Sequence, residues 1–327
     1  MQKRNAYAAA IVTVLFALPS GAVAQEARDY GSRPIRLVVP VAAGGGTDVI
    51  ARLVAAGLGE SAGLQVIVDN RGGAGGVIAS ETVARAIPDG YTLLFPYASH
   101  TTMPFLAKVP YDAYSDFTAV TQVAASPLVL IVHPSLPVNN VKELIALAKS
   151  TPKGLTAGIA TPGSAGHLAT ELFKLRTGTT SGIVSVIYKG SGATQVAMLS
   201  GEVQLTFVST PSAMSYLKSG KVKMLATSSK KRIAYLPELP TFAELGVPVE
   251  ASPWQGILGP AKMSRAIVMR LYGEVTKLVK QPNIIERLAV AGSEPVGSTP
   301  EEFAAKIKQE LQEFAKIIPG LGIKETP

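Results

Sequence analysis

The chain alternates short apolar runs, rich in β-branched residues, with stretches in which apolar residues recur every three or four positions. The first pattern predicts buried strands and the second predicts amphipathic helices. In the first third, the run 35–40 predicts a strand. The helix predicted next, over 47–58, is expected to bury one face, which carries Val49, Ile50, Leu53, Val54 and Leu58. The remaining predictions for this third are strands over 65–69 and 92–96 and a helix over 78–86.

The middle of the chain continues the alternation and adds helix-capping signals. Asn140 is expected to cap a helix, with Glu143 three positions on as its partner in a capping box. Thr210 and Pro211 open a later helix, which ends at Gly220. The other predictions for this part are a helix over 166–176 and strands over 128–132, 155–160, 183–188, 203–208 and 222–227.

The last third is predominantly helical. Ser264 is expected to cap a helix whose inward residues are Ile267, Val268, Leu271, Val275 and Leu278. Pro282 begins another helix. Thr299 and Glu302 form a capping box, with Pro300 in the first turn. The C-terminal helix that they open is expected to run through Phe303, Ile307, Leu311 and Phe314.

This order of elements is typical of α/β domains built on parallel sheets. The length of 327 residues suggests about two domains. An isolated strand predicted over 255–259 follows the second series and would return the chain to the first domain. We therefore expect an α/β fold in which domain 1 is discontinuous, with a cleft between the domains. The expected boundaries are 25–126 plus 255–327 for domain 1 and 127–254 for domain 2.

Composition narrows the possible chemistry. The sequence contains no cysteine, which excludes a disulfide framework, a thiolate nucleophile and a cysteine-ligated metal site. Its 31 glycines and 23 prolines exceed the usual share, but they do not reach that of a fibrous or disordered chain. Such a composition predicts many tight turns and places where the backbone approaches a neighbour closely. No spacing indicates a metal site or a cofactor.

The first 24 residues are interpreted as a secretory signal peptide. Lys3 and Arg4 form a charged start, 8–18 is an apolar run, and Ala22-Val23-Ala24 predicts cleavage after Ala24. The apolar run is too short to span a bilayer, which needs about 20 residues. A buried N-terminal helix is the alternative interpretation. We expect the mature chain to be soluble and exported.

The net charge favours anionic ligands, and the distribution of the basic residues argues against a nucleic-acid partner. The formal net charge is +8, and removal of Lys3 and Arg4 with the signal peptide leaves +6. A modest positive field favours small anionic molecules by steering them toward the protein. The basic residues are dispersed and carry no interleaved aromatic residues, so no nucleic-acid partner is predicted.

A glycine-rich loop over 42–48 follows the first strand and opens a helix. Converging amides and the helix N-terminus would hold a carboxylate or a phosphate there. Val49 stands where a dinucleotide fingerprint needs glycine, and no Lys-Ser or Lys-Thr pair follows, which excludes a P-loop. An ordinary βα turn capped by Asp48 or Thr47 is the alternative.

A second loop, over 160–167, has the same place between a strand and a helix. Ser164 is a candidate nucleophile, but Pro162 breaks the nucleophile-elbow pattern and no histidine has a triad spacing. Anion binding by the amides and hydroxyls of this loop is the favoured interpretation. An exported hydrolase built on Ser164 and a histidine is the rival interpretation.

Two further stretches are candidates of lesser weight. The cluster 72–76 is expected to form a turn of unusual dihedral angles before a helix. A hydroxyl-rich stretch, Ser99-His100-Thr101-Thr102, follows the third strand at its carboxyl end. Ligands of open α/β sheets bind at those ends.

The sequence resembles a known family, the periplasmic solute-binding receptors of the tripartite tricarboxylate transporter type, which is also called the Bug family. The resemblance runs over essentially the whole mature chain. Its stretches in the first half are Arg33-Pro34-Ile35, 38–40, 42–48, Asn70-Arg71 with Gly75-Gly76, and 88–94. Those in the second half are 132–137, Gly163-Ser164 with 166–168, 188–191, Leu239-Pro240-Thr241 with Glu244 and Gly246, and 294–297.

The resemblance implies a type II periplasmic-binding fold with two α/β domains and a ligand cleft that closes on a small organic acid. The ligand would be a di- or tricarboxylate or an aromatic acid, held largely by main-chain amides. The implied contacts of the first domain are Ala43, Gly44, Gly45, Gly46, Thr47, Ser99, His100 and Thr101. The implied contacts of the second domain are Ala160, Thr161, Ser164, Ala165, Ser209 and Thr210.

The family also implies a periplasmic monomer that is not an enzyme and that serves the membrane subunits of a transporter. A receptor that reports to a sensor kinase is the alternative. One departure bears on the ligand, because the family often carries Phe-Asp-Asn where this chain has Phe207-Val208-Ser209. The missing aspartate would pair with an amino group. An acidic amino acid is therefore a poorer ligand candidate than an unsubstituted or aromatic acid.

Overall fold

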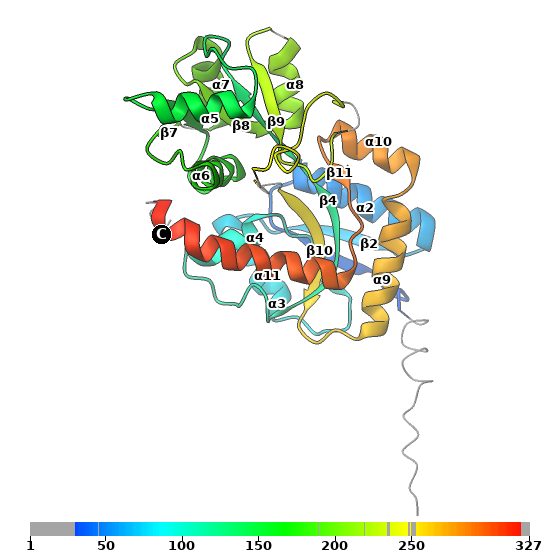
Figure 1. Cartoon of the computed structure of the whole chain (residues 1–327). Helices are drawn as coiled ribbons and strands as arrows, with labels where there is room; N and C mark the ends of the chain where they lie inside the picture. Colours follow the sequence, from blue (N-terminus) through cyan, green and yellow to red (C-terminus); the bar gives the residue numbers. More distant parts are fainter. Residues whose placement is uncertain are drawn as a thin grey trace, which may run out of the picture.

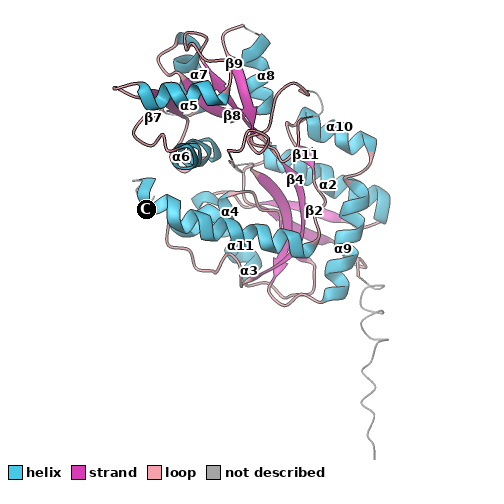
Figure 2. Cartoon of the chain, in the orientation of Figure 1, coloured by secondary structure: helices cyan, strands magenta, loops and turns pink. Residues whose placement is uncertain are grey.

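The computed structural model describes residues 30–321 apart from Gly45, Lys189, Ser219, Ala234, Tyr235, Pro248 and 250–252. The described residues form two mixed β-sheets, each covered by helices (Figures 1 and 2). The predicted signal peptide lies outside the described residues. None of the described helices has both the length and the apolar character needed to cross a bilayer.

The first sheet combines strands from both ends of the chain. Its described strands are β1 (Ile35–Val39), β2 (Val66–Asn70), β3 (Thr92–Leu94), β4 (Phe117–Ala125), β10 (Trp254–Pro260) and β11 (Glu294–Pro295). They lie in the order β11-β4-β10-β3-β1-β2. β1 is parallel to β2 and β3, whereas β10 is antiparallel to β3 and β4. The isolated strand predicted near 255–259 is therefore confirmed as β10, paired with strands that precede it by more than a hundred residues.

Helices cover both faces of this sheet, and the alternation along β1 shows why. Leu37 and Val39 face the cluster formed with α2 and α9, whereas Val38 faces the cluster formed with α3 and α11. The helices and short turns of this unit are α2 (Gly46–Ala62), α3 (Val77–Ala84), α4 (Ser99–Thr102), α9 (Arg265–Leu278), α10 (Pro282–Val290), α11 (Pro300–Ile317), η1 (Ala74–Gly76), η2 (Met103–Phe105) and η3 (Ile318–Leu321).

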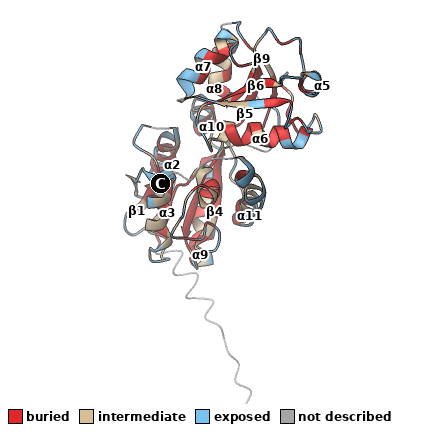
Figure 3. Cartoon of the chain, turned by 90° about the vertical axis from the view of Figure 1, so that its left-hand side faces the viewer, coloured by how far each residue is buried: buried red, intermediate tan, exposed pale blue. Residues whose placement is uncertain are grey.

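The second sheet is formed by the middle of the chain. Its described strands are β5 (Leu128–Val132), β6 (Leu155–Ile159), β7 (Ile183–Ile187), β8 (Leu205–Ser209) and β9 (Lys223–Thr227), in the order β7-β6-β8-β5-β9. β6 is parallel to β7 and β8, whereas β5 is antiparallel to β8 and β9. The covering helices are α5 (Val141–Ser150), α6 (Ala165–Thr177), α7 (Ser191–Ser200) and α8 (Thr210–Lys218). Figure 3 shows the strands of both sheets largely buried beneath their helices.

The predicted caps at Asn140 and Thr299 are confirmed, whereas Ser264 precedes α9 without a side-chain capping hydrogen bond. The Asn140 side chain accepts a hydrogen bond from the Glu143 amide at the start of α5. Thr299 and Glu302 form a reciprocal capping box at the start of α11. Such caps satisfy amides that the first helical turn leaves without partners, and each typically stabilises a helix by about 1 kcal/mol.

Three expectations from the sequence need correction. The sheets are mixed and not parallel, because β4 leaves the first sheet and β10 returns to it in the opposite direction. The strand β4 was not predicted at all. Val49 was expected on the buried face of α2 but is 49% exposed, while Ile50, Leu53, Val54 and Leu58 are buried as expected. Val49 lies in the first turn of α2.

Two chain crossings connect the sheets, from β4 to β5 and from β9 to β10. They lie side by side, since the Ser126 amide donates to the Pro253 carbonyl oxygen at 2.6 Å. A third contact joins the end of α11 to α6 of the other unit (Figures 1 and 3). There Ile318 packs in one apolar cluster with Leu106 and Leu168, and Arg176 lies 3.6 Å from Glu313.

Candidate functional site

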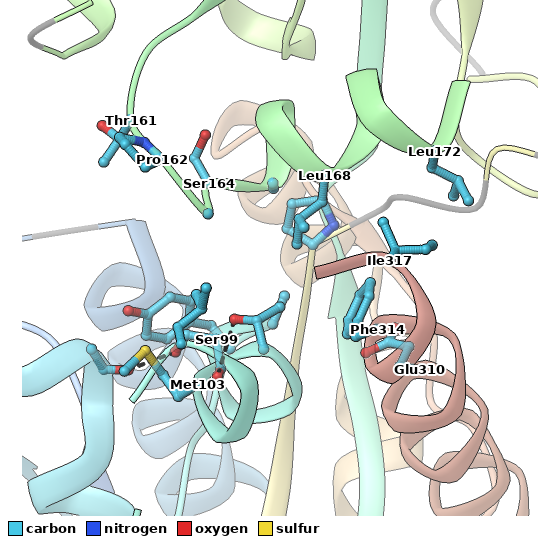
Figure 4. Close-up of a pocket in the computed structure, with 18 residues that line it drawn as sticks. Ser99, Met103, Thr161, Pro162, Ser164, Leu168, Leu172, Glu310, Phe314 and Ile317 are labelled. Carbon is cyan, nitrogen blue, oxygen red and sulfur yellow. Dashed lines mark hydrogen bonds between the residues drawn. The ribbon is translucent and has the colours of Figure 1, made fainter. Parts of the chain in front are cut away.

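A cavity of about 360 Å³ lies between the two units, and we call it the inter-sheet cavity. Figure 4 shows α4 and α11 on one side and the start of α6 on the other. Its lining residues are Gly75, Tyr97, Ala98, Ser99, Thr102, Met103, Leu106, Thr161, Pro162, Gly163, Ser164, Ala165, Leu168, Leu172, Pro253, Glu310, Phe314 and Ile317. The cavity thus brings Ser99 of the first unit together with Thr161, Ser164 and Ala165 of the second.

A second cavity, of about 240 Å³, lies at the carboxyl edge of the second sheet, and we call it the second-sheet cavity. The parallel strands β6, β7 and β8 end there, and α6, α7 and α8 begin there. Each helix start carries partial positive charge from its unpaired amides. The polar side chains of the described lining are uncharged. They are hydroxyls, with one amide from Gln195: Ser164, Ser191, Thr194, Gln195, Thr206, Ser209, Ser212 and Tyr216.

The two cavities meet at the start of α6, because Ser164 and Ala165 line both of them. The Ser164 side chain caps α6 by accepting a hydrogen bond from the His167 amide at 3.3 Å. Gly163 has a φ of +70°, a conformation that glycine adopts at little cost. A Cβ atom at Gly163 would come within 2.9 Å of a Leu106 methyl carbon, so the absence of a side chain lets the two units approach here.

His167 holds this loop from within the helix. Its Nδ1 atom accepts a hydrogen bond from the Gly163 amide at 3.0 Å, so the ring proton belongs on Nε2, which lies 4.0 Å from Glu171. Glu171 in turn accepts from Lys174 at 2.8 Å and from Ser185. Burial lowers the pKa of His167 below its ordinary range, and the nearby Glu171 carboxylate only partly opposes this effect. The imidazole is therefore neutral at pH 7, as the bond from Gly163 requires.

Ser99 is positioned by the glycine cluster of residues 72–76. Its hydroxyl donates to the Gly75 carbonyl oxygen at 2.9 Å. Gly73, Gly75 and Gly76 all have positive φ, which confirms the predicted turn of unusual dihedral angles. A Cβ at Gly75 would lie 2.4 Å from the Met103 sulfur atom. The turn thus forms part of the wall of the inter-sheet cavity and does not merely precede a helix.

His100 and Thr101 point into the core of the first unit. His100 is 3% exposed, and its Nε2 donates to the Ala113 carbonyl oxygen at 2.9 Å. Its ring packs edge-on against Phe117. Thr101 is fully buried and donates to Glu310 at 2.8 Å. Neither residue lines either cavity, because successive side chains of a short helix point in different directions.

The loop 42–48 lies at the carboxyl end of β1, and its described residues line neither cavity. Asp48 organises it from a buried position: its carboxylate accepts from the Gly44 amide at 2.8 Å, from Arg52 at 3.0 Å and from Asn70 at 2.8 Å. Burial would raise the pKa of Asp48, but these hydrogen bonds hold the pKa below its ordinary value. Ala43, Gly44 and Gly46 are exposed, Thr47 is partly buried, and Gly45 lies outside the described residues.

The candidates near β8 have different surroundings. Ser209 is exposed in the second-sheet cavity, and its hydroxyl lies 3.0 Å from that of Ser212. Ala160 lines the same cavity. Thr210 is buried and donates to the Pro127 carbonyl oxygen at 3.0 Å. Thr210 thereby joins the start of α8 to the crossing between the two units.

Sequence reasoning missed the contribution of α11. Glu310, Phe314 and Ile317 line the inter-sheet cavity from the far end of the chain. The periodicity of α11 marked Phe314 as inward, but it could not show that the last turns pass beyond the first sheet and reach α6. The acidic Glu310 offered no signal of its own among the many charged residues of that helix.

Two α/β units, joined by two adjacent crossings and separated by a cavity, define the type II fold of periplasmic binding proteins. The family model described as the tripartite tricarboxylate transporter family receptor matches residues 50–323. Protein BugT of Bordetella pertussis is 35% identical over 319 residues, which are 96% of this chain and 97% of that protein. The chain therefore belongs to the tripartite tricarboxylate transporter receptor family.

Solved structures agree with this assignment. A protein of R. palustris solved with adipate is 36% identical, with a TM-score of 0.68, and the match covers 88% of this chain and 97% of that one. A TctC solute-binding protein from Polaromonas, solved without ligand, has a TM-score of 0.82 at 27% identity, and the match covers 89% of this chain and 100% of that one.

Proposed function

We propose that this protein is a periplasmic receptor that captures a small organic carboxylate between its two domains. The observation that carries the proposal is the meeting of three helix starts at the second-sheet cavity, which shares Ser164 and Ala165 with the inter-sheet cavity. The similar protein of R. palustris that was solved with adipate supports a carboxylate as the ligand class.

The chemistry of the lining fits an anion held by neutral groups. Ser191, Ser209 and Ser212 offer hydroxyl donors, and the helix starts offer amides with partial positive charge. Among the described residues, neither lining includes a lysine, an arginine or a histidine. Hydrogen bonds to a carboxylate are stronger than those between neutral groups, which is sufficient for capture without a cationic side chain.

The three histidines argue against the hydrolase interpretation. The Nδ1 of His167 accepts from the Gly163 amide and so is not available as a base to the Ser164 hydroxyl, which caps the helix. His133 pairs with Ser135 at 2.7 Å, and His100 pairs with the Ala113 carbonyl. We infer that the protein is not an enzyme.

The domain boundaries follow the strand crossings in this proposal, with 25–126 plus 255–327 as domain 1 and 127–254 as domain 2. Rotation about the adjacent crossings would close the cavity on the ligand. We further propose that the chain is exported after cleavage behind Ala24, acts as a monomer, and passes its ligand to the membrane subunits of a tripartite tricarboxylate transporter. A pull-down with membrane proteins separates this role from signalling to a sensor kinase.

Thermal-shift and calorimetric titrations with a panel of organic acids test the proposal. At least one acid is expected to raise the melting temperature, and the Ser209→Ala variant is expected to bind it roughly tenfold more weakly, because a donor to the carboxylate is lost. Ser150→Ala, on exposed α5, is the matched control and should bind as the unchanged protein does. Binding of sugars or amines but of no carboxylate would contradict the proposal.

The replacement of the family's common aspartate by Val208 adds a narrower test. Succinate is expected to bind more tightly than glutamate, because the described lining of the second-sheet cavity includes no acidic side chain that could pair with an amino group. Small-angle X-ray scattering should then show a smaller radius of gyration when the bound acid is present. An unchanged radius under saturating ligand would count against closure of the domains.

A further inference from the structure

The inter-sheet cavity changes character from one side to the other. Ser99, Thr161 and Ser164 stand on one side (Figure 4), and Ser164 also lines the second-sheet cavity. On the opposite side, Phe314 and Ile317 of α11 face Leu168 and Leu172 of α6 (Figure 4). A ligand whose carboxylate is held near Ser164 would therefore extend its remaining atoms between two apolar helix surfaces.

One charged side chain, Glu310, is present in the described lining of this cavity. Its oxygens accept from Trp254 Nε1 at 2.8 and 3.0 Å, from Thr101 at 2.8 Å and from Lys306 at 2.9 Å. These four contacts occupy the carboxylate oxygens as acceptors. A second carboxylate on the ligand would meet acceptor oxygens at this wall and no donor from Glu310.

The apolar side is also fixed to both units, which makes it a lasting wall and not a transient gap. Ile318, directly after Ile317, is 2% exposed and packs with Leu106 and Leu168. The Arg176–Glu313 pair lies one turn further toward the start of α11. Phe314 and Ile317 thus face α6 across the cavity and are positioned by anchored neighbours on either side.

Together these features point to the substrate class. We propose that the inter-sheet cavity selects an acid with a single carboxylate and an uncharged apolar body, with Phe314 and Ile317 as the residues that determine this specificity. The inference rests on the proposed function, since it assumes that the carboxylate is held at the start of α6. Burial of an apolar chain is favourable at this wall, whereas a terminal charge there would lose its hydration without gaining a donor.

Two matched pairs of probes test the inference by calorimetry on the mature chain. Hexanoate and adipate share a six-carbon chain, and benzoate and terephthalate share a ring; within each pair only the second carboxylate differs. In the pair whose carbon skeleton fits the cavity, the monocarboxylate is expected to bind at least tenfold more tightly than the dicarboxylate. Equal binding, or tighter binding of the diacid, would overturn the inference.

If the apolar wall determines the preference for an acid with one carboxylate, a substitution in that wall should reverse this preference. Ile317→Lys places a cation opposite the carboxylate side and is expected to weaken the single acid and strengthen the diacid, each by about tenfold. Val290→Lys makes the same exchange at a residue that is 82% exposed on α10, and it should leave the ratio unchanged. Phe314→Ala is the second variant; it should weaken hexanoate or benzoate without reversing the ratio.

The outcomes separate this inference from the proposed function. An unchanged ratio in Ile317→Lys, with circular dichroism showing an intact fold, would overturn the specificity inference while carboxylate binding stands. Binding of only short acids such as succinate would do the same. If no carboxylate of any kind binds, the proposed function itself fails and the inference falls with it.

Discussion

The Nδ1 atom of His167 accepts a hydrogen bond from the main-chain amide of Gly163 across 3.0 Å. This bond joins the first turn of α6 to the loop before it and sets the position of Ser164 between the two cavities. It exists only while the imidazole lacks a proton on Nδ1. The geometry of the proposed ligand site is therefore linked to the protonation of one buried side chain.

Lowering the pH is expected to reduce the folding stability that depends on this neutral imidazole. Burial lowers the pKa of His167, so the folded protein resists protonation while the unfolded chain takes up a proton near pH 6.5. The stability contributed by neutral His167 is thus complete above about pH 6.5 and falls as the pH decreases below it. Urea unfolding at pH 7.5 and 5.0 should show this loss, and the pH dependence of stability should be smaller in His167→Leu, which should also bind the ligand about tenfold more weakly at pH 7.5. A pH dependence in His167→Leu as large as that of the unchanged protein would contradict the assignment.

His100 should account for a larger part of the acid sensitivity of folding. Burial lowers the pKa of His100 to about 4, although its bond to the Ala113 carbonyl opposes this shift. The unfolded chain therefore binds a proton below about pH 6.5 that the folded chain does not, which costs on the order of 3 kcal/mol by pH 4. Urea unfolding at pH 7 and 4.5 should show a smaller loss of stability in His100→Leu. His133→Gln, at a histidine paired with Ser135 near the surface, is the control and should keep the full loss.

Gly163→Ala is expected to destabilise the protein and weaken binding. The residue has a φ of +70°, and a Cβ would lie 2.9 Å from a Leu106 methyl carbon of the other unit. Gly246 has a φ of +72° with no atom within 4 Å of its Cβ position, so Gly246→Ala measures the backbone cost alone, about 1 kcal/mol. The excess loss in Gly163→Ala should appear both in the free energy of unfolding and in the affinity. Equal effects of the two variants would show that the contact with Leu106 has no role.

Removal of the Ile318 side chain should weaken the third contact between the units. Ile318 is 2% exposed and packs with Leu106 and Leu168, so Ile318→Ala is expected to cost about 2–4 kcal/mol of unfolding free energy. Ile285→Ala removes the same atoms from a side chain that is 41% exposed on α10 and should cost less than 1 kcal/mol. Chemical denaturation measures both. A similar small cost for both variants would mean that the end of α11 does not stabilise the pairing of the units.

Local patterns were sufficient for much of the fold. Asn140 and Thr299 cap their helices as predicted, because a cap involves residues only three positions apart. The inward face of α9 was predicted in full, since all of its expected residues are buried. The strand β4 was missed because its burial depends on pairing with β10, more than a hundred residues later. No local pattern shows such a pairing.

The candidate site was likewise predicted only in part. The loop at Gly163 and Ser164 was recognisable from its place between a strand and a helix, and the structure places it in the wall of both cavities. His100 was proposed from its neighbourhood with Ser99, but its side chain turns into the core beside Phe117. Side-chain direction in a short helix is decided by packing with distant residues.

The sequence by itself determined the family, most of the succession of strands and helices, and the glycine-rich loops between a strand and a helix, because these depend on residues close together in the chain. Only the tertiary structure decided that three helix starts share one cavity and that α11 crosses to α6, where Phe314 and Ile317 face Leu168 and Leu172. Those arrangements depend on contacts between elements that are not neighbours in the chain. Their energy comes from burial and pairing in three dimensions, which no periodicity in the sequence records.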